Sequence, residues 1–184
     1  MNRSSGLRSR KESIKQLHDS ILAADLHYRI YWIYKNKDDR EKYFDIMNSY
    51  LGFFEHSIQA HFKAFTVILY TIYERSPDTV NFGRLLAEAS AELKASVDPQ
   101  YVRAKAIWKK IAVLRNNHFG HMSAHLDADA VFKIADITYN EIKELIDISK
   151  ELVNSLSYEE DRSKFVYTLD SAKDTYRMLE KLRS

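Results

Sequence analysis

The stretch LGFFEHSIQAHFKAFTVILY, residues 51–70, lies within the longest run of regularly spaced apolar residues in the chain. Over a wider segment these recur every three or four positions, at Met47, Leu51, Phe54, Ile58, Phe62, Phe65, Ile68 and Ile72. This spacing predicts one helix over about residues 39–74, bent near Gly52 and rich in aromatic core residues. Its most apolar part, residues 62–73, is short and contains Lys63, which predicts a buried helix and no membrane span.

Helical spacing continues on both sides of this segment. It predicts helices over about residues 9–35, 81–95, 128–133 and 161–182, another that starts at Asp98-Pro99 and ends at Gly120, and one that follows Thr138. The expected helix starts are an aspartate of the polar run 35–39, Asn81, Asp98 with proline in the first turn, and Thr138 with Glu141 as a capping box.

Composition agrees with an all-helical protein. The 184 residues are 45% hydrophobic and 29% charged, and they include only 4 glycines and 2 prolines, few for a turn-rich β architecture. We expect an all-α fold, a single antiparallel bundle of about five to six helices formed by residues 9–184. Residues 1–8 are expected to be a flexible basic tail.

Several classes of site are excluded by what the sequence lacks. The absence of cysteine removes disulfides, thiolate nucleophiles and cysteine-bound zinc. There is no phosphate-binding glycine loop, no His-Glu-x-x-His, no Glu-x-x-His pair for a di-iron bundle and no Gly-x-Ser-x-Gly. The net charge of +2 is only mildly basic. No apolar run follows the first basic residues, so we expect no signal peptide and a cytoplasmic location.

The residues suited to chemistry gather at Leu114-Arg115-Asn116-Asn117-His118-Phe119-Gly120-His121. On a helix, Arg115 and His118 lie one turn apart on the same face, and His121 follows the helix-ending Gly120. RNA cleavage by the 2′-hydroxyl needs a base, an acid and positive charge beside the phosphate. Histidine serves as acid or base near neutrality, and arginine offers a planar fork for phosphate oxygens. This chemistry needs neither metal nor cofactor.

Two other interpretations of the same stretch remain open. His118, His121 and His125, with Asp127 nearby, would also suit a metal site. Alternatively, His118 caps the helix C-terminus and Arg115 makes a structural salt bridge.

The stretch resembles the Arg-x(4–6)-His signature of the HEPN superfamily, in its abortive-infection U-type branch. In that branch the pattern is arginine, two polar residues, histidine, an apolar residue, a small residue and histidine, which residues 115–121 reproduce. The segments 70–75 and 80–86 resemble the same branch, and the resemblance covers roughly residues 10–160.

The resemblance implies a metal-independent endoribonuclease, often a toxin or an antiphage effector, that acts as a homodimer with both signatures at the interface. By analogy Arg115 stabilises the phosphorane charge, His121 acts as acid or base, Asn116 positions them, and His118 is a secondary candidate. RNA is then the substrate, and an antitoxin protein is a potential partner. A catalytically silent module that binds a partner protein or nucleotide is the alternative, since the superfamily contains such modules.

Aromatic and histidine residues elsewhere favour structural roles. Trp108 lies two helical turns before Arg115. It would either form the floor of a cleft or simply pack against other side chains. Core or dimer packing is favoured over base stacking for the aromatic end of the first helix, Tyr28, Tyr31, Trp32 and Tyr34. His56 and His61 do not share a helix face well, so structural or surface roles are favoured.

Overall fold

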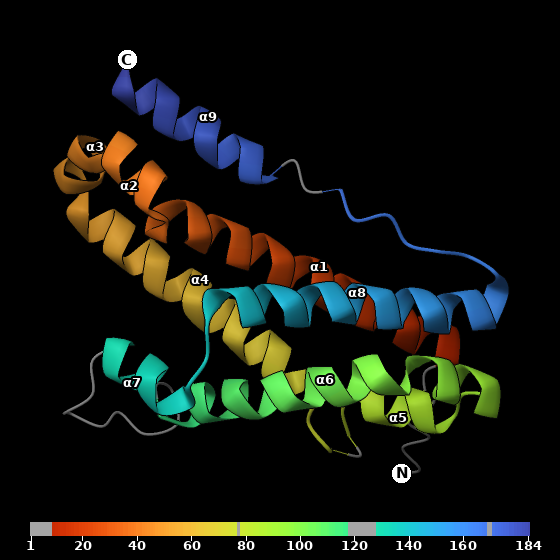
Figure 1. Cartoon of the computed structure of the whole chain (residues 1–184). Coiled ribbons are helices and arrows are strands. Elements are labelled where there is room, and N and C mark those ends of the chain that lie inside the picture. The colour runs from red at the N-terminus through yellow and green to blue at the C-terminus, as the bar shows by residue number, and fades with distance from the viewer. Residues whose placement is uncertain (1–8, 77, 118–127, 169–170) are drawn as a thin grey trace, which may run out of the picture.

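Four long antiparallel helices form the bundle. The computed structural model describes residues 9–76, 78–117, 128–168 and 171–184, and all regular structure within them is helical. The long helices are α1 (Arg10–Lys35), α4 (Leu51–Thr71), α6 (Ala91–Arg115) and α8 (Tyr139–Asp161). Each packs on two others in the cyclic order α1, α4, α6, α8, and neighbours run in opposite directions (Figure 1). The predicted all-α antiparallel bundle is confirmed.

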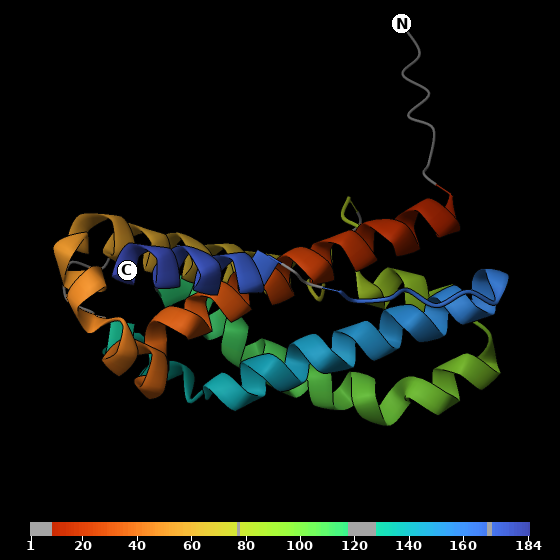
Figure 2. The ribbon, with the colours of Figure 1, turned by 90° about the horizontal axis from the view of Figure 1, so that it is seen from above.

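Five shorter helices complete the described part of the chain. They are α2 (Lys37–Lys42), α3 (Phe44–Ser49), α5 (Phe82–Ala87), α7 (Ala128–Ala135) and α9 (Ser171–Arg183). Figure 2 shows α9 beside the end of the bundle where α1 leads into α2 and α3. The predicted basic tail, residues 1–8, lies outside the described residues.

The first long helix follows its sequence pattern closely. The side chain of Ser9 accepts from the backbone N–H of Glu12, and the Glu12 carboxylate accepts from that of Ser9, so a capping box begins α1. The predicted apolar stripe is buried in the core: Ile14, Leu17, Ile21, Ala24, Tyr28 and Tyr31. A capping box formed by Thr138 and Glu141 begins α8, as predicted. The predicted helical piece at residues 128–133 is also confirmed, as α7.

The predicted single helix over residues 39–74 is wrong. Asn36 ends α1 and caps α2 instead of an aspartate, and the helix breaks again at Tyr43 and Tyr50. Gly52 lies in the first turn of α4, so the expected bend occurs earlier.

Packing at the end of the bundle explains these breaks. They fold α2 and α3 back so that a second apolar cluster closes over the end of α1: Ile33, Tyr34, Tyr43, Ile46, Phe54 and Leu179. The buried Tyr43 hydroxyl donates to Glu180 of α9 at 2.7 Å. Because one straight helix would carry Tyr43 and Ile46 away from this cluster, burial outweighs the continuous helical pattern.

The predicted helix over residues 81–95 divides in two. Asn81 caps α5 as expected, with its side-chain oxygen accepting from the backbone N–H of Arg84 at 2.9 Å. However, α5 ends at Ala87, and Ser90 caps α6, so Asp98-Pro99 is not a helix start. Pro99 lies inside α6, where it removes the donor to the carbonyl of Ala95. Both residues are exposed, so water can hydrate this carbonyl.

The predicted last helix starts later than expected. Arg162 takes a left-handed conformation with φ of 61° and ends α8, and residues 162–168 then run without helix. Asn154 of α8 holds this segment, because its side-chain oxygen accepts from the backbone N–H of Phe165 at 2.8 Å. Helix resumes only at α9.

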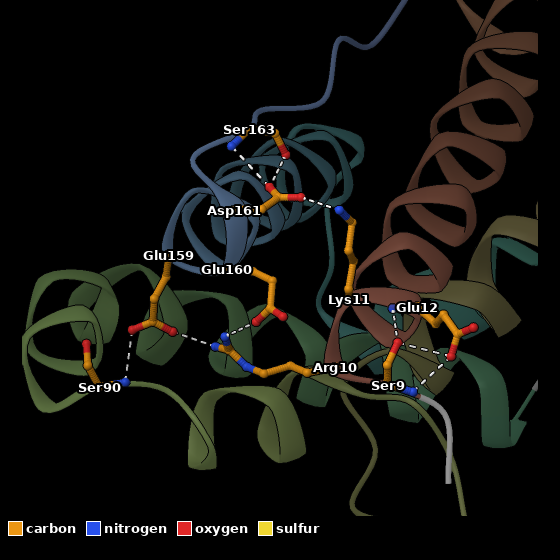
Figure 3. A network of polar contacts seen from close by, with 9 residues as sticks. All are labelled: Ser9, Arg10, Lys11, Glu12, Ser90, Glu159, Glu160, Asp161 and Ser163. Atoms are coloured by element: carbon orange, nitrogen blue, oxygen red, sulfur yellow. Dashed lines mark hydrogen bonds and ion pairs between the residues drawn. The ribbon is translucent and has the colours of Figure 1, made fainter. Parts of the chain in front are cut away.

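A polar network ties three helices together at the opposite end. The Arg10 guanidinium of α1 donates to both Glu159 and Glu160 of α8, and Glu159 also accepts from the backbone N–H of Ser90, the α6 cap (Figure 3). The Arg10 and Glu159 side chains are mostly buried. This network holds the starts of α1 and α6 against the end of α8, far from the end of α6.

Candidate active site

Arg115 is the last residue of α6 and lies at the rim of the core. Buried apolar residues fix the rotation of this helix, at Val97, Ala104, Ile107, Ile111 and Leu114. One residue on from Leu114, the helix turns by about 100°, which leaves Arg115 half-buried. The backbone N–H of Asn116 donates to Ala112 and Val113, and the chain continues through Asn117 in a wider, π-type turn.

Neutral groups hold the Arg115 guanidinium. Its Nη1 donates to the side-chain oxygen of Asn116 at 3.0 Å, and its Cζ lies 4.9 Å from the ring centroid of Tyr70 on α4. No carboxylate forms an ion pair with it in the part of the chain that the structure describes. The structural salt bridge therefore finds no support among these residues, and none of their carboxylates neutralises the guanidinium.

A stack of rings and cations extends from Arg115 along α6. Tyr70 stacks on Trp108 with centroids 5.8 Å apart and planes at 26°, and the indole N–H of Trp108 donates to the Tyr70 carbonyl at 2.9 Å. On Trp108 lies Lys105, whose Nζ is 3.6 Å from the ring centroid. Trp108 is half-buried and packs against these side chains. Packing was one of the two roles predicted for it, the other being the floor of a cleft.

Two members of this stack, Lys105 and Tyr70, have no role predicted from the sequence. Lys105, Trp108 and Arg115 occur at intervals of three and seven residues, which places them on one helix face and would have indicated Lys105. Tyr70 lies on another helix. Its contact with Arg115 depends on how α4 crosses α6, which no local spacing encodes.

Lys105 lies among other cations. Burial lowers the pKa of Lys105, and the nearby charges of Arg75 and Lys109 lower it further. Each of these neighbours is a cation, so the field favours bound anions. A phosphate group would relieve the mutual repulsion.

The amides beside Arg115 have different surroundings. Asn116 is exposed and accepts from Arg115, which fits a role in positioning the guanidinium. Asn117 turns back, and its Nδ2 donates to the Val113 carbonyl at 2.9 Å. The other candidates, His118 and His121, lie outside the described residues, as do His125 and Asp127 of the metal interpretation. Within the described ranges, no three histidine or acidic side chains gather closely enough to hold a metal ion.

Elsewhere, histidines and aromatic residues have the structural roles expected of them. His56 is exposed, whereas His61 pairs with His27 of α1 through their Nδ1 atoms, 2.8 Å apart. Burial lowers the pKa of both His27 and His61, and the charge of His27 lowers that of His61 further. At the aromatic end of α1, the side chains of Tyr28, Tyr31 and Tyr34 are buried, whereas Trp32 is 38% exposed.

A hollow of about 350 Å³ lies between α1, α8 and α9 and is lined in part by Trp32 and Tyr176. Its charged groups neutralise one another. Asp25 binds both Arg29 and Lys150, and Asp147 binds Lys143. It therefore lacks the unpaired charge that distinguishes the surroundings of Arg115.

Comparison with known proteins gives one match. The model of the family AbiU2, a family of HEPN domains, matches residues 11–179. No curated protein matches the chain, and no solved structure does. None of the helices in the described residues is long and apolar enough to cross a membrane.

Proposed function

The chain belongs to the AbiU2 family of HEPN domains, and we propose that it is a metal-independent endoribonuclease. We expect it to act in the cytoplasm as a toxin or an antiphage effector of abortive infection. The observation that carries the proposal is Arg115. This half-buried arginine has no carboxylate partner in the described residues and opens a sequence with two histidines within six positions.

In the proposed reaction the 2′-hydroxyl of RNA attacks the adjacent phosphorus. A histidine takes the hydroxyl proton as the new 2′-oxygen–phosphorus bond forms. The bond from phosphorus to the 5′-oxygen breaks, and an acid protonates that oxygen, which leaves a 2′,3′-cyclic phosphate and a 5′-hydroxyl. Both proton transfers suit imidazole.

Each candidate residue has a role in this scheme. Arg115 stabilises the negative charge that grows on the phosphoryl oxygens. His121 is the acid or base, and His118 is the second candidate for a proton transfer. Asn116 positions Arg115, which is supported by the 3.0 Å hydrogen bond between them.

A homodimer would place two such sites together. We propose that two copies pair with their Arg115 and His121 stretches facing one another, so that acid, base and cation are supplied around one cleft. The expected mass in solution is twice that of the 21.6 kDa chain. An antitoxin protein would act by covering this cleft.

The test is RNA cleavage by the purified protein in excess EDTA, beside Arg115→Ala and His121→Ala. We expect the unaltered protein to cleave and both variants to lose about 100-fold or more in rate, as removal of a group that stabilises transition-state charge does. Arg103→Ala is the matched control, because it removes an exposed, ion-paired arginine of the same helix. Cleavage only with added metal, or undiminished in Arg115→Ala, would contradict the mechanism.

A silent interaction module is the second candidate. Four large apolar side chains at the α3–α4 corner are each more than half exposed: Phe44, Tyr50, Leu51 and Phe53. Exposed apolar clusters favour contact with another protein. If the protein and its variants are equally inert on varied RNAs, this module becomes the favoured function.

A further inference from the structure

The cations of α6 differ in how they are neutralised. On the side that faces α8, Arg103 pairs with Glu144 through two hydrogen bonds of 2.7 and 2.6 Å, and Lys110 pairs with Glu141 at 2.8 Å. On the side that carries the ring stack, neither Lys105 nor Lys109 has an ion pair within the described residues. One face of the helix is thus balanced internally, and the other is not.

Lys105 is held in place without a counter-charge. Its ammonium donates to the Tyr73 carbonyl at 3.1 Å and lies over Trp108, half-buried. The charges that act on it are those of Arg75 and Lys109, both positive. Partial burial of a cation among cations costs stability, and a bound anion would offset that cost.

Two aromatic rings connect the unpaired charge of Lys105 to Arg115. From Lys105 to Arg115 the helix rises by about 15 Å, at about 1.5 Å per residue, and Trp108 and Tyr70 fill the space between them. We call the surface of Arg75, Lys105, Lys109 and Trp108 the basic strip. It borders the candidate active site without including the proposed proton-transfer residues.

We propose that the basic strip binds the single-stranded RNA that flanks the cleaved phosphate. The inference rests on the proposed function, because the strand is the one cut beside Arg115. In-line attack by a 2′-hydroxyl requires a backbone geometry that a regular duplex does not offer, so the ligand is a single strand. A row of cations is typical of surfaces that follow such a backbone.

The strip recognises charge and not base identity. Tyr70 and Lys105 already lie against the Trp108 ring, so it offers no open face for a base. Contacts to phosphates fix position along a strand but carry no sequence information. We therefore expect little sequence preference and a strong dependence on salt.

The test measures binding of a fully 2′-O-methylated RNA strand by fluorescence anisotropy over a range of salt concentrations. This probe lacks the attacking hydroxyl, so binding is measured apart from cleavage. The double variant K105Q/K109Q removes two unpaired charges, and the control R103Q/K110Q removes two paired charges from the same helix. Thermal unfolding of each variant shows whether it is folded.

We expect K105Q/K109Q to bind about tenfold more weakly. The magnitude of its salt slope should fall by about 1.4, because each phosphate contact with a single strand contributes about 0.7. The control should stay within about twofold of the unaltered protein, since its charges are already neutralised. Equal weakening in both double variants, or no binding of the strand at low salt, would overturn the proposal.

Three further outcomes separate this inference from its alternatives. Polyglutamate that competes as well as RNA at equal charge would assign the strip to an acidic protein and overturn the proposal. If the strand binds as expected and unmodified RNA is not cleaved, the proposed function fails and the strip stands. If cleavage is intact and K105Q/K109Q binds normally, the strip fails and the proposed function stands.

Discussion

Arg115 carries a charge that its described surroundings do not neutralise. Its contacts there are one amide oxygen and the face of one phenol ring, both uncharged. Such contacts orient a guanidinium and leave its charge available, which suits a group that must stabilise a phosphoryl transition state. Tyr70 is on this account a positioning residue that acts through Arg115.

Replacement of Tyr70 should lower turnover and have little effect on RNA binding. We expect Tyr70→Leu to reduce kcat about 2- to 10-fold, because a cation–π contact of about 0.5–1.4 kcal/mol no longer orients the guanidinium. Tyr70→Phe keeps the ring and should retain activity. Steady-state kinetics would separate kcat from KM, and equal losses in both variants would contradict the role of the ring.

The His27–His61 pair should make stability depend on pH. One Nδ1 donates and the other accepts, so two protonated rings would place two donors 2.8 Å apart. Their pKa values lie below 6.5 in the folded state, mainly through burial. Because the folded state resists protonation, this stability is complete above the unfolded value of 6.5 and is lost as pH falls below it.

Chemical denaturation at about pH 7.5 and about pH 5.5 would measure this dependence, since histidine titrates between them. We expect the free energy of unfolding to fall at the lower pH, and His27→Gln/His61→Gln to remove most of that fall. His56→Gln is the control, because His56 is an exposed histidine of the same α4 helix. An unchanged pH dependence in the double variant would argue against the pair.

At the scale of elements, local signals were reliable where tertiary packing agreed with them. The spacing of apolar residues identified α1 and most of α4, and capping patterns identified the starts of α5 and α8. The pattern failed at Tyr43 and Tyr50, where burial of the second apolar cluster, which includes Tyr43 but not Tyr50, breaks a helix that periodicity alone would continue. It failed again at Pro99, because α6 starts earlier at Ser90 and tolerates a proline on its exposed side.

Pro99 is therefore expected to destabilise α6. Pro99→Ala restores the backbone donor to Ala95 and should stabilise the protein by about 1–2 kcal/mol. A proline costs about 3 kcal/mol inside a helix, and part of this is offset by the greater freedom of the unfolded chain. Thermal unfolding would measure the gain against Gln100→Ala, an exposed neighbour. A destabilised Pro99→Ala would show that the helix does not continue through this position.

The whole molecule is an antiparallel bundle with a packed cluster at one end and an ionic network at the other. Helix α9 reaches the apolar end through Leu179, which is fully buried. We expect Leu179→Ala to lower the free energy of unfolding by about 3 kcal/mol, as removal of a buried leucine typically does. Leu182→Ala alters a half-exposed residue of the same helix and should change it little. Unfolding in denaturant would measure both variants, and equal losses of unfolding free energy would contradict the packing of α9 against this end of the bundle.

The sequence predicted the architecture more completely than the surroundings of the site. The all-α bundle followed from periodicity and composition, whereas the roles of Arg115 and Asn116 stay predictions, made from the residue types of this stretch and from the family resemblance. The contact of Tyr70 with Arg115, and the difference between paired and unpaired cations on α6, depend on how helices cross. No pattern within one helix encodes such crossings.

The central claim is that the 2′-hydroxyl of RNA is the nucleophile and that no metal takes part. The most direct measurement offers a labelled RNA strand and its fully 2′-O-methylated counterpart to the protein in EDTA and identifies the product ends. The account predicts cleavage of the unmodified strand alone, with 2′,3′-cyclic phosphate ends, and its loss in Arg115→Ala. Cleavage of the methylated strand, 3′-hydroxyl products, or no cleavage of either strand would contradict it.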